Sequence, residues 1–110
     1  MHSKDISVSR IENEKHLLRF LCASREEIAQ RQKLFQRLTQ YSWLANDNQI
    51  LFEAIGELLA TAPQQILSHL PAALTRRGFP DISCDALAEP STMNAPAAFA
   101  LAEELLRASQ

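Results

Sequence analysis

Residues 41–59 read YSWLANDNQILFEAIGELL, and this stretch decides how the chain folds. It holds the only tyrosine and the only tryptophan, Tyr41 and Trp43, followed by a run with helical periodicity. The apolar residues of the run cover about twice the ~100° arc of an ordinary surface helix; they are Ile50, Leu51, Phe52, Ala54, Ile55, Leu58 and Leu59. The pattern predicts a central helix covered on two sides, with Glu53 and Glu57 on a narrow exposed strip and Trp43 packed under the preceding corner.

Helical signals also fill the chain before this stretch. Ser9-Arg10-Ile11-Glu12 has the form of a capping box and predicts a helix that ends near Cys22. A second capping box at 24–27 predicts a helix over about residues 25–39. Arg31 falls on the apolar face of that helix, and we expect its side chain to snorkel to solvent.

The central helix is expected to begin after Asn46 as its N-cap. Pro63 suits the first position of a further helix, which keeps its apolar phase to Arg77. Pro71 interrupts that phase, because proline lacks an amide hydrogen, and predicts either a kinked helix or two short ones. Gly78 then predicts a left-handed C-terminal stop.

The last third of the chain is richer in proline. A short helix fits near residues 83–89, and Asn94-Ala95-Pro96 opens a final helix, in which Glu103 and Arg107 can pair at i, i+4. No stretch alternates apolar and polar residues as a strand would. The sequence therefore predicts an all-α protein, a single compact bundle of five to six helices.

Length and composition agree with one globular domain. The 110 residues carry a net charge of −2 and are 46% hydrophobic. We expect a flexible arm over residues 1–8 and one helical domain over 9–108. No apolar run approaches the ~18 residues that a membrane span needs, and the N-terminus lacks a secretory pattern, so a cytoplasmic location is expected. Cys22 and Cys84 lie too far apart for a CxxC pair and are expected to be reduced core residues.

No constellation predicts a reaction. Three residues after Glu53 and Glu57 come Gly56 and Ala60, where a di-iron bundle would need histidine. The three histidines, His2, His16 and His69, are isolated from one another and from the cysteines, so they do not form a metal-binding pattern. The two glycines are too few to build a phosphate-binding loop. The sequence predicts neither an enzyme nor a cofactor or metal site.

Arg76-Arg77-Gly78-Phe79 is the best candidate for contact with a partner. Two cations at a helix C-terminus interact favourably with its dipole, which alone could explain them. Arginine and aromatic residues are also enriched at interface hot spots, so Arg76, Arg77 and Phe79 are candidate partner-binding residues. The basic residues of the 25–39 helix are interleaved with Glu26 and Glu27, and direct nucleic-acid binding is therefore not expected.

The order of these features resembles a known family. The run Glu14 to Leu21, the corner Tyr41 to Trp43 and the run Asn48 to Ile55 are similar to the N-terminal domain of the DnaB-type replicative helicase and to the related helicase-binding C-terminal domain of DnaG-type primase. The likeness continues through Leu70 to Gly78 and covers about residues 11–107. It implies a non-enzymatic docking module whose partner is a replicative helicase or another replication protein.

Two other interpretations stay open at the level of sequence. One is a small DNA-binding regulator with a helix-turn-helix, although the central helix is too apolar to lie in a groove of DNA. The other is a homo-oligomeric scaffold. The chain has no Walker motif and no primase core, so the resemblance implies either a detached end of a primase or a free-standing relative; the oligomeric state and the partner are not predicted.

Overall fold

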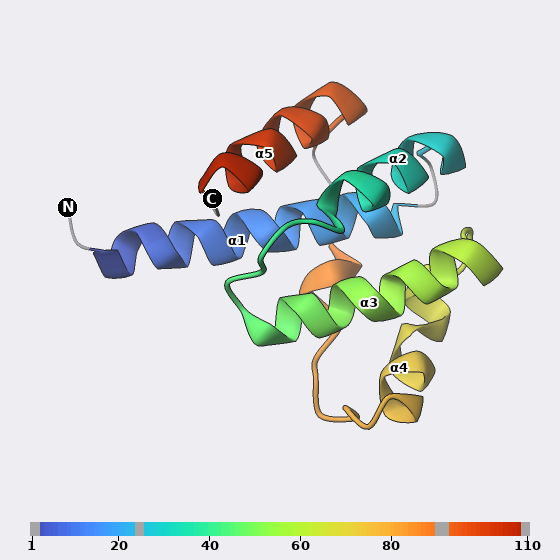
Figure 1. The fold of residues 1–110 in the computed structure, drawn as a ribbon. Helices are drawn as coiled ribbons and strands as arrows, with labels where there is room; N and C mark the ends of the chain where they lie inside the picture. The colour runs from blue at the N-terminus through green and yellow to red at the C-terminus, as the bar shows by residue number, and fades with distance from the viewer. Residues whose placement is uncertain (1–2, 24–25, 90–92, 109–110) are drawn as a thin grey trace.

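The structure, a computed structural model, describes residues 3–23, 26–89 and 93–108. Within these ranges the chain forms five α-helices and one 3₁₀ helix, and no strand (Figure 1). The elements are α1 Ser3–Cys22, α2 Ile28–Leu38, α3 Asn46–Thr61, α4 Ile66–Arg76, η1 Asp85–Ala88 and α5 Ala95–Ala108. The predicted all-α class and the single compact bundle are confirmed.

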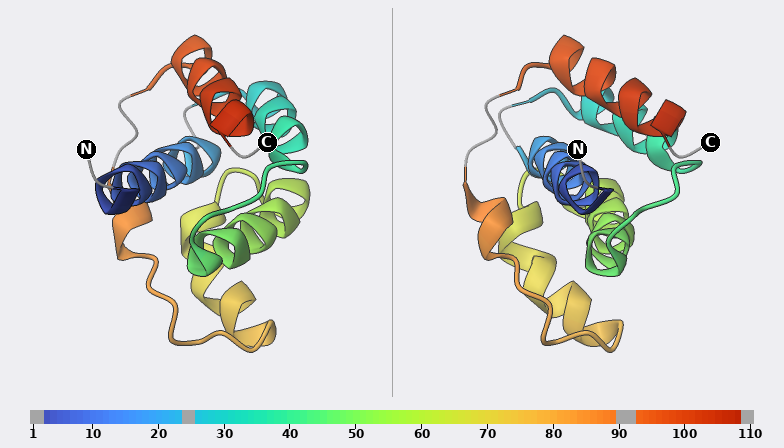
Figure 2. Two further views of the ribbon diagram at one scale, coloured as in Figure 1. Left: turned by 60° about the vertical axis from the view of Figure 1, so that its left-hand side comes forward. Right: turned by 90° about the vertical axis from the view of Figure 1, so that its left-hand side faces the viewer.

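Helix α1 lies at the centre of the bundle. It contacts α2 and α5 on one side and α3 and η1 on the other, while α4 packs chiefly on α3 and lies at the edge (Figures 1 and 2). The radius of gyration is 13.3 Å, the value expected of a compact domain of about 100 residues.

The core confirms the prediction for the central helix. Leu51, Phe52, Ala54, Ile55, Leu58 and Leu59 are buried, and Ile50 is half-buried. Glu53 is exposed and Glu57 is partly exposed, as the wheel indicates. Leu17, Leu18, Phe20 and Leu21 of α1 and Leu70 and Leu74 of α4 complete the two covering layers.

The predicted starts of the first two helices need correction. Helix α1 begins at Ser3, so Ser9 lies inside the helix and does not cap it. The mobility of residues 1–8 stays a prediction, but the backbone from Ser3 onward forms the first turns of α1. In the second capping box, residues 24–25 lie outside the described part of the chain, and α2 begins at Ile28 after an N-cap without a side-chain hydrogen bond.

Helix α4 also begins later than predicted. Residues 62–65 form a turn in which the Gln65 amide donates to the Ala62 carbonyl at 3.0 Å, and the helix starts at Ile66, not at Pro63. The helix continues through Pro71, so of the two predicted alternatives, a kinked helix or two short helices, the second is wrong. Pro71 has no amide hydrogen to donate within the helix, and α4 packs on α3 along its buried side.

The end of α4 confirms the predicted glycine stop. Gly78 has φ 92°, its amide donates to Thr75 at 3.0 Å, and the Phe79 amide donates to Leu74 at 2.8 Å. These are the two hydrogen bonds of a Schellman motif, which glycine adopts without a steric penalty.

The C-terminal helix begins where the sequence predicts, at Ala95 directly after Asn94. The Asn94 Oδ1 atom accepts a hydrogen bond from the Ala97 amide at 3.0 Å, and η1 lies inside the predicted 83–89 segment. Glu103, however, binds Arg37 of α2 through two hydrogen bonds of 2.6 and 2.7 Å. This ion pair joins two helices, and its hydrogen bonds lower the pKa of Glu103; the charge of Arg107, the local partner that the sequence predicts, contributes further.

Candidate functional site

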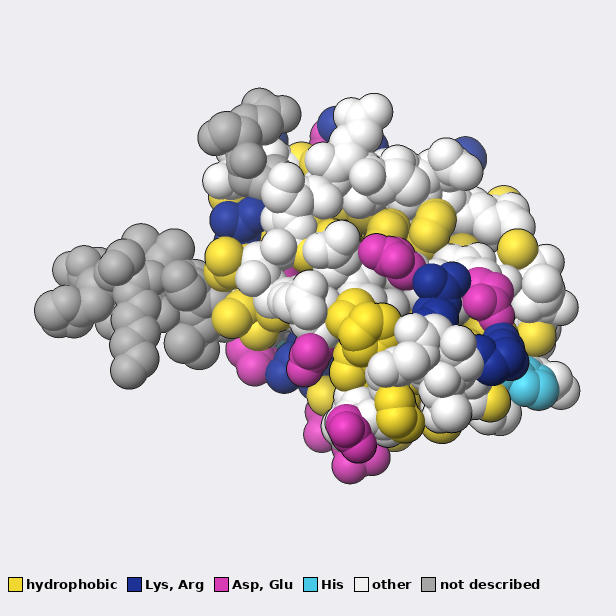
Figure 3. Space-filling view, turned by 60° about the horizontal axis from the view of Figure 1, so that its bottom comes forward, with side chains coloured by type: hydrophobic (Ala, Val, Ile, Leu, Met, Phe, Trp, Pro, Cys, Tyr) yellow, Lys and Arg dark blue, Asp and Glu magenta, His cyan; other side chains and the backbone are white. Residues whose placement is uncertain are grey.

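The predicted partner-binding arginines lie where the C-terminal end of α4 meets α3. Arg76 forms an ion pair with Glu57, and Arg77 contacts Glu57 at 3.3 Å and Glu53 at 3.8 Å. We call these four side chains the α3–α4 ion-pair cluster. The cluster brings together two features that the sequence suggests separately, the carboxylate strip and the basic corner. Acidic side chains accordingly lie beside basic ones on the face shown in Figure 3.

Phe79 remains exposed next to this cluster. Its exposed fraction is 40%, and that of Leu67 near the start of α4 is 38%. Pro71, also exposed, lies one helical turn after Leu67 and hence on the same side of α4. We call Leu67, Pro71 and Phe79 the α4 apolar flank. Of the three predicted partner-binding residues, Phe79 is thus available for contact, while both arginines already bind carboxylates of α3.

A buried carboxylate, which the sequence interpretation missed, holds the corner before α3. Glu14 of α1 is fully buried and accepts hydrogen bonds from the Tyr41 hydroxyl at 2.5 Å and the Leu44 amide at 2.6 Å. It also accepts from the Ala45 amide at 3.3 Å and from Asn48 Nδ2 at 3.0 Å. Glu14 stands three and four residues before the buried Leu17 and Leu18, and this spacing indicates that Glu14 lies on the buried side of α1.

This Glu14 network stabilises the fold by joining α1 to the corner before α3. The carboxylate lies at the N-terminus of α3, where the helix dipole favours negative charge. The N-cap of α3 is Ala45 and carries no side-chain cap, so the prediction of Asn46 as N-cap is wrong. Arg10 Nε donates to the Tyr41 hydroxyl at 2.9 Å. Burial, and next the hydrogen bond to Glu14, raise the pKa of Tyr41 above its usual value.

Trp43 packs as the sequence predicted. Its ring lies 5.0 Å from that of Tyr41 in an edge-on arrangement and 4.9 Å from that of Phe52, measured between centroids. Such contacts stabilise a core beyond their buried area. Trp43 therefore fixes the corner between α2 and α3.

Arg31 is fully buried, so the prediction that it snorkels is wrong. Its Nη1 atom donates to the Pro63 carbonyl at 2.7 Å and weakly to the Leu21 carbonyl at 3.4 Å, while Nε and Nη2 have no partner among the residues that the structure describes. Burial lowers the pKa of Arg31. The side chain joins the end of α1 to the α3–α4 turn.

Both cysteines are free thiols, as expected, and Cys22 is buried. Burial raises the pKa of Cys22 to about 12 and also raises that of Cys84. A protonated thiol is a poor nucleophile and a poor metal ligand. Neither cysteine therefore has the environment of a reactive residue.

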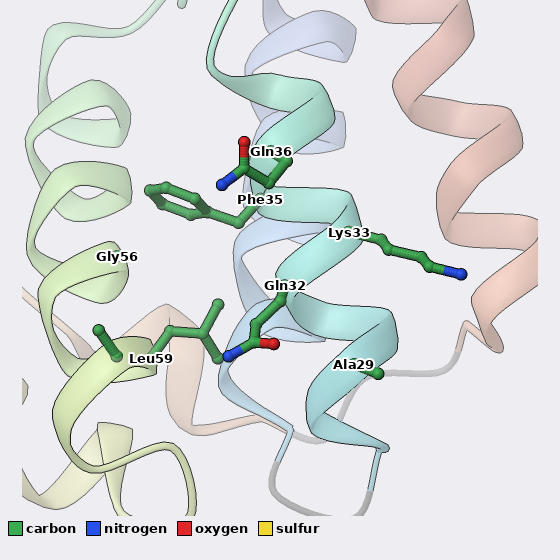
Figure 4. Close-up of a pocket in the computed structure, with 8 residues that line it drawn as sticks. Ala29, Gln32, Lys33, Phe35, Gln36, Gly56 and Leu59 are labelled. Carbon is green, nitrogen blue, oxygen red and sulfur yellow. The ribbon is translucent and has the colours of Figure 1, made fainter.

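An open groove of about 680 Å³ runs between α2 and α3 (Figure 4). Its floor contains Phe35, which stacks on Phe52 with ring centroids 4.3 Å apart, and Gly56, where a Cβ would lie 2.2 Å from the Phe35 ring. Gln32 and Gln36 of α2 stand beside the groove. The sequence interpretation did not find it, although glycine inside an apolar helix is the signal of such a close approach.

Two kinds of site are absent from the residues that the structure describes. No group of three or more His, Cys, Asp or Glu there could hold a metal ion, and no helix there is long and apolar enough to cross a membrane. The chain matches no protein-family model, no curated protein and no solved structure.

Proposed function

We propose that this protein is a non-enzymatic helical interaction module, related to the docking domains of DnaG-type primase and DnaB-type helicase, that binds a replication protein through the α4 apolar flank. The observation that carries the proposal is the exposure of Leu67 in α4, which packs chiefly on α3, and of Phe79, which follows Gly78 just beyond the end of α4. Exposed apolar surface is typical of protein interaction sites.

The arrangement of charge supports a protein partner over a nucleic acid. Arg37, Arg76 and Arg77 each bind a carboxylate of another helix. Arg19 also lies beside a carboxylate, that of Glu89 just after η1, at 3.6 Å. A phosphate backbone would have to displace these carboxylates, and binding to DNA depends chiefly on cations that are free to contact phosphates.

The test measures binding of the purified protein to the replicative helicase and to the primase of the source organism by biolayer interferometry. We expect saturable binding to one of them, weakened at least about tenfold by the double substitution Leu67→Ala, Phe79→Ala, because truncated hot-spot residues typically cost more than a factor of ten. Leu44→Ala is the matched control, since Leu44 is 42% exposed but precedes α3.

A second double variant separates the flank from the arginines. Arg76→Ala, Arg77→Ala removes the cations of the α3–α4 ion-pair cluster, and it should weaken partner binding less than the flank variant does. Absence of binding to both proteins would refute the replication partner. Affinity for duplex DNA that falls steeply with salt would instead support the DNA-binding regulator.

A further inference from the structure

A small cavity lies where α1, the start of α3 and the segment around η1 meet. Its volume is about 240 Å³, the share of about eight water molecules at ~30 Å³ each, and it suits a ligand of about eight to ten non-hydrogen atoms. Helix α1 packs against both α3 and η1, so the walls belong to the core of the bundle. The apolar part of the lining consists of Leu51, Ile82, Ala86 and Leu87.

Asn48 lines this cavity and has one polar atom left for a ligand. Its exposed fraction is 1%, and its Nδ2 atom donates to Glu14 Oε1 at 3.0 Å and weakly to the Ile11 carbonyl at 3.4 Å. Both partners accept hydrogen bonds, so the amide cannot be reversed and Oδ1 faces away from them. No donor among the described residues contacts Oδ1. A hydrogen-bond donor placed in the cavity would satisfy this oxygen.

Two opposite charges line the same cavity and come from different helices. The Asp47 carboxylate, in the first turn of α3, forms no ion pair within the described part of the chain. Lys15 of α1 contacts Glu12 of the same helix at 4.0 Å, and both side chains are partly exposed. Exposed ion pairs of this kind contribute little, so the ammonium group can exchange Glu12 for a carboxylate of a ligand. The cavity thus offers an anionic, acceptor-rich pole and a cationic pole.

We infer that this cavity binds a free α-amino acid with an aliphatic side chain. The ligand ammonium group donates to Asp47 and to Asn48 Oδ1, its carboxylate pairs with Lys15, and its side chain lies against the apolar part of the lining. Small-molecule sites combine such an apolar lining with a few polar groups that fix the orientation of the ligand. An amine or a carboxylic acid alone leaves one pole unpaired. None of the lining residues belongs to the α4 apolar flank, so the inference goes beyond the docking function.

The test is a titration of the isotope-labelled protein with L-leucine, followed by amide NMR spectroscopy. We expect saturable shifts of the Asp47, Asn48 and Leu87 amide signals and a Kd between about 0.1 and 1 mM, because so small a ligand has limited affinity. Isoamylamine lacks the carboxylate of leucine, and isocaproate lacks its ammonium group. Each should bind at least about tenfold more weakly than leucine, because each loses charge-assisted hydrogen bonds.

Substitutions at the two poles test the assignment of the charges. Lys15→Gln and Asp47→Asn should each weaken leucine binding at least about tenfold. Lys33→Gln and Glu104→Gln are the matched controls, with the same losses of charge on exposed side chains of α2 and α5, and should bind leucine as the wild type does. Circular dichroism confirms that each variant is folded.

Three results would each overturn the inference. They are the absence of saturable shifts up to about 10 mM leucine, binding of the amine or the acid as tight as that of leucine, and equal effects of the cavity and control variants. These results are independent of binding to a replication protein, which concerns the α4 apolar flank.

Discussion

Gly56→Ala tests the close approach of α2 and α3. In the middle of a helix alanine is favoured over glycine by about 1 kcal/mol, so helix propensity alone predicts stabilisation. The structure predicts the opposite, because the new Cβ would lie 2.2 Å and 2.5 Å from two atoms of the Phe35 ring, which is itself stacked on Phe52. Overpacking of this kind costs about 1–3 kcal/mol. The net expectation is a loss of about 1 kcal/mol in the free energy of unfolding.

The assay is a double-mutant cycle measured by urea denaturation and thermal melting. In the Phe35→Ala background no ring opposes the Cβ, and Gly56→Ala should then stabilise by about 1 kcal/mol, a coupling of about 2 kcal/mol between the two sites. Each kcal/mol corresponds to a shift of about 4–8 °C in Tm for a domain of this size. Stabilisation by Gly56→Ala in the wild-type background, or the same effect in both backgrounds, would refute the proposed contact.

Three further predictions concern the buried polar side chains. Glu14→Gln should lower the free energy of unfolding in urea by about 2–4 kcal/mol, because it breaks a buried charge-assisted network, whereas Glu12→Gln on the exposed face should change it little. Tyr41, the only tyrosine, should not ionise in the native state near the usual pKa of about 10. Since its folded pKa is raised, the stability linked to it is present below about pH 10 and is lost as pH rises through the folded pKa; absorbance at ~295 nm should report ionisation only together with unfolding. Arg31→Met should keep the free energy of unfolding within about 1 kcal/mol of wild type or raise it, since two guanidinium nitrogens have no partner in the described part of the chain, and a loss above about 2 kcal/mol would contradict this account.

Features set by local sequence could be predicted. The two-sided burial of α3, the glycine stop at Gly78 and the Asn94 cap each depend on residues within a few positions of one another. Helix starts were less reliable, because the serine at position 9 has the right neighbours for a cap, but α1 gains stability by continuing through it. A capping motif describes a possible boundary and does not exclude a longer helix.

The candidate site depended on contacts that a sequence does not display. Arg76 and Arg77 were recognised as a cationic corner, but their pairing with Glu53 and Glu57 follows from the packing of α4 on α3. The burial of Arg31 likewise depends on the Pro63 carbonyl, 32 residues away. Polar residues become buried when distant partners satisfy them, and such partners cannot be identified from helical periodicity.

The Glu14 network also has a consequence for the order in which the chain folds. The side chains and amides that satisfy Glu14 lie 27 to 34 residues downstream. While the chain is being synthesised, α1 can form a helix but cannot dock with Glu14 buried until residues up to Asn48 are available, because an unsatisfied carboxylate in the core is costly. The first two helices should therefore not form an autonomous folding unit, and α1 should join its native packing together with the corner before α3.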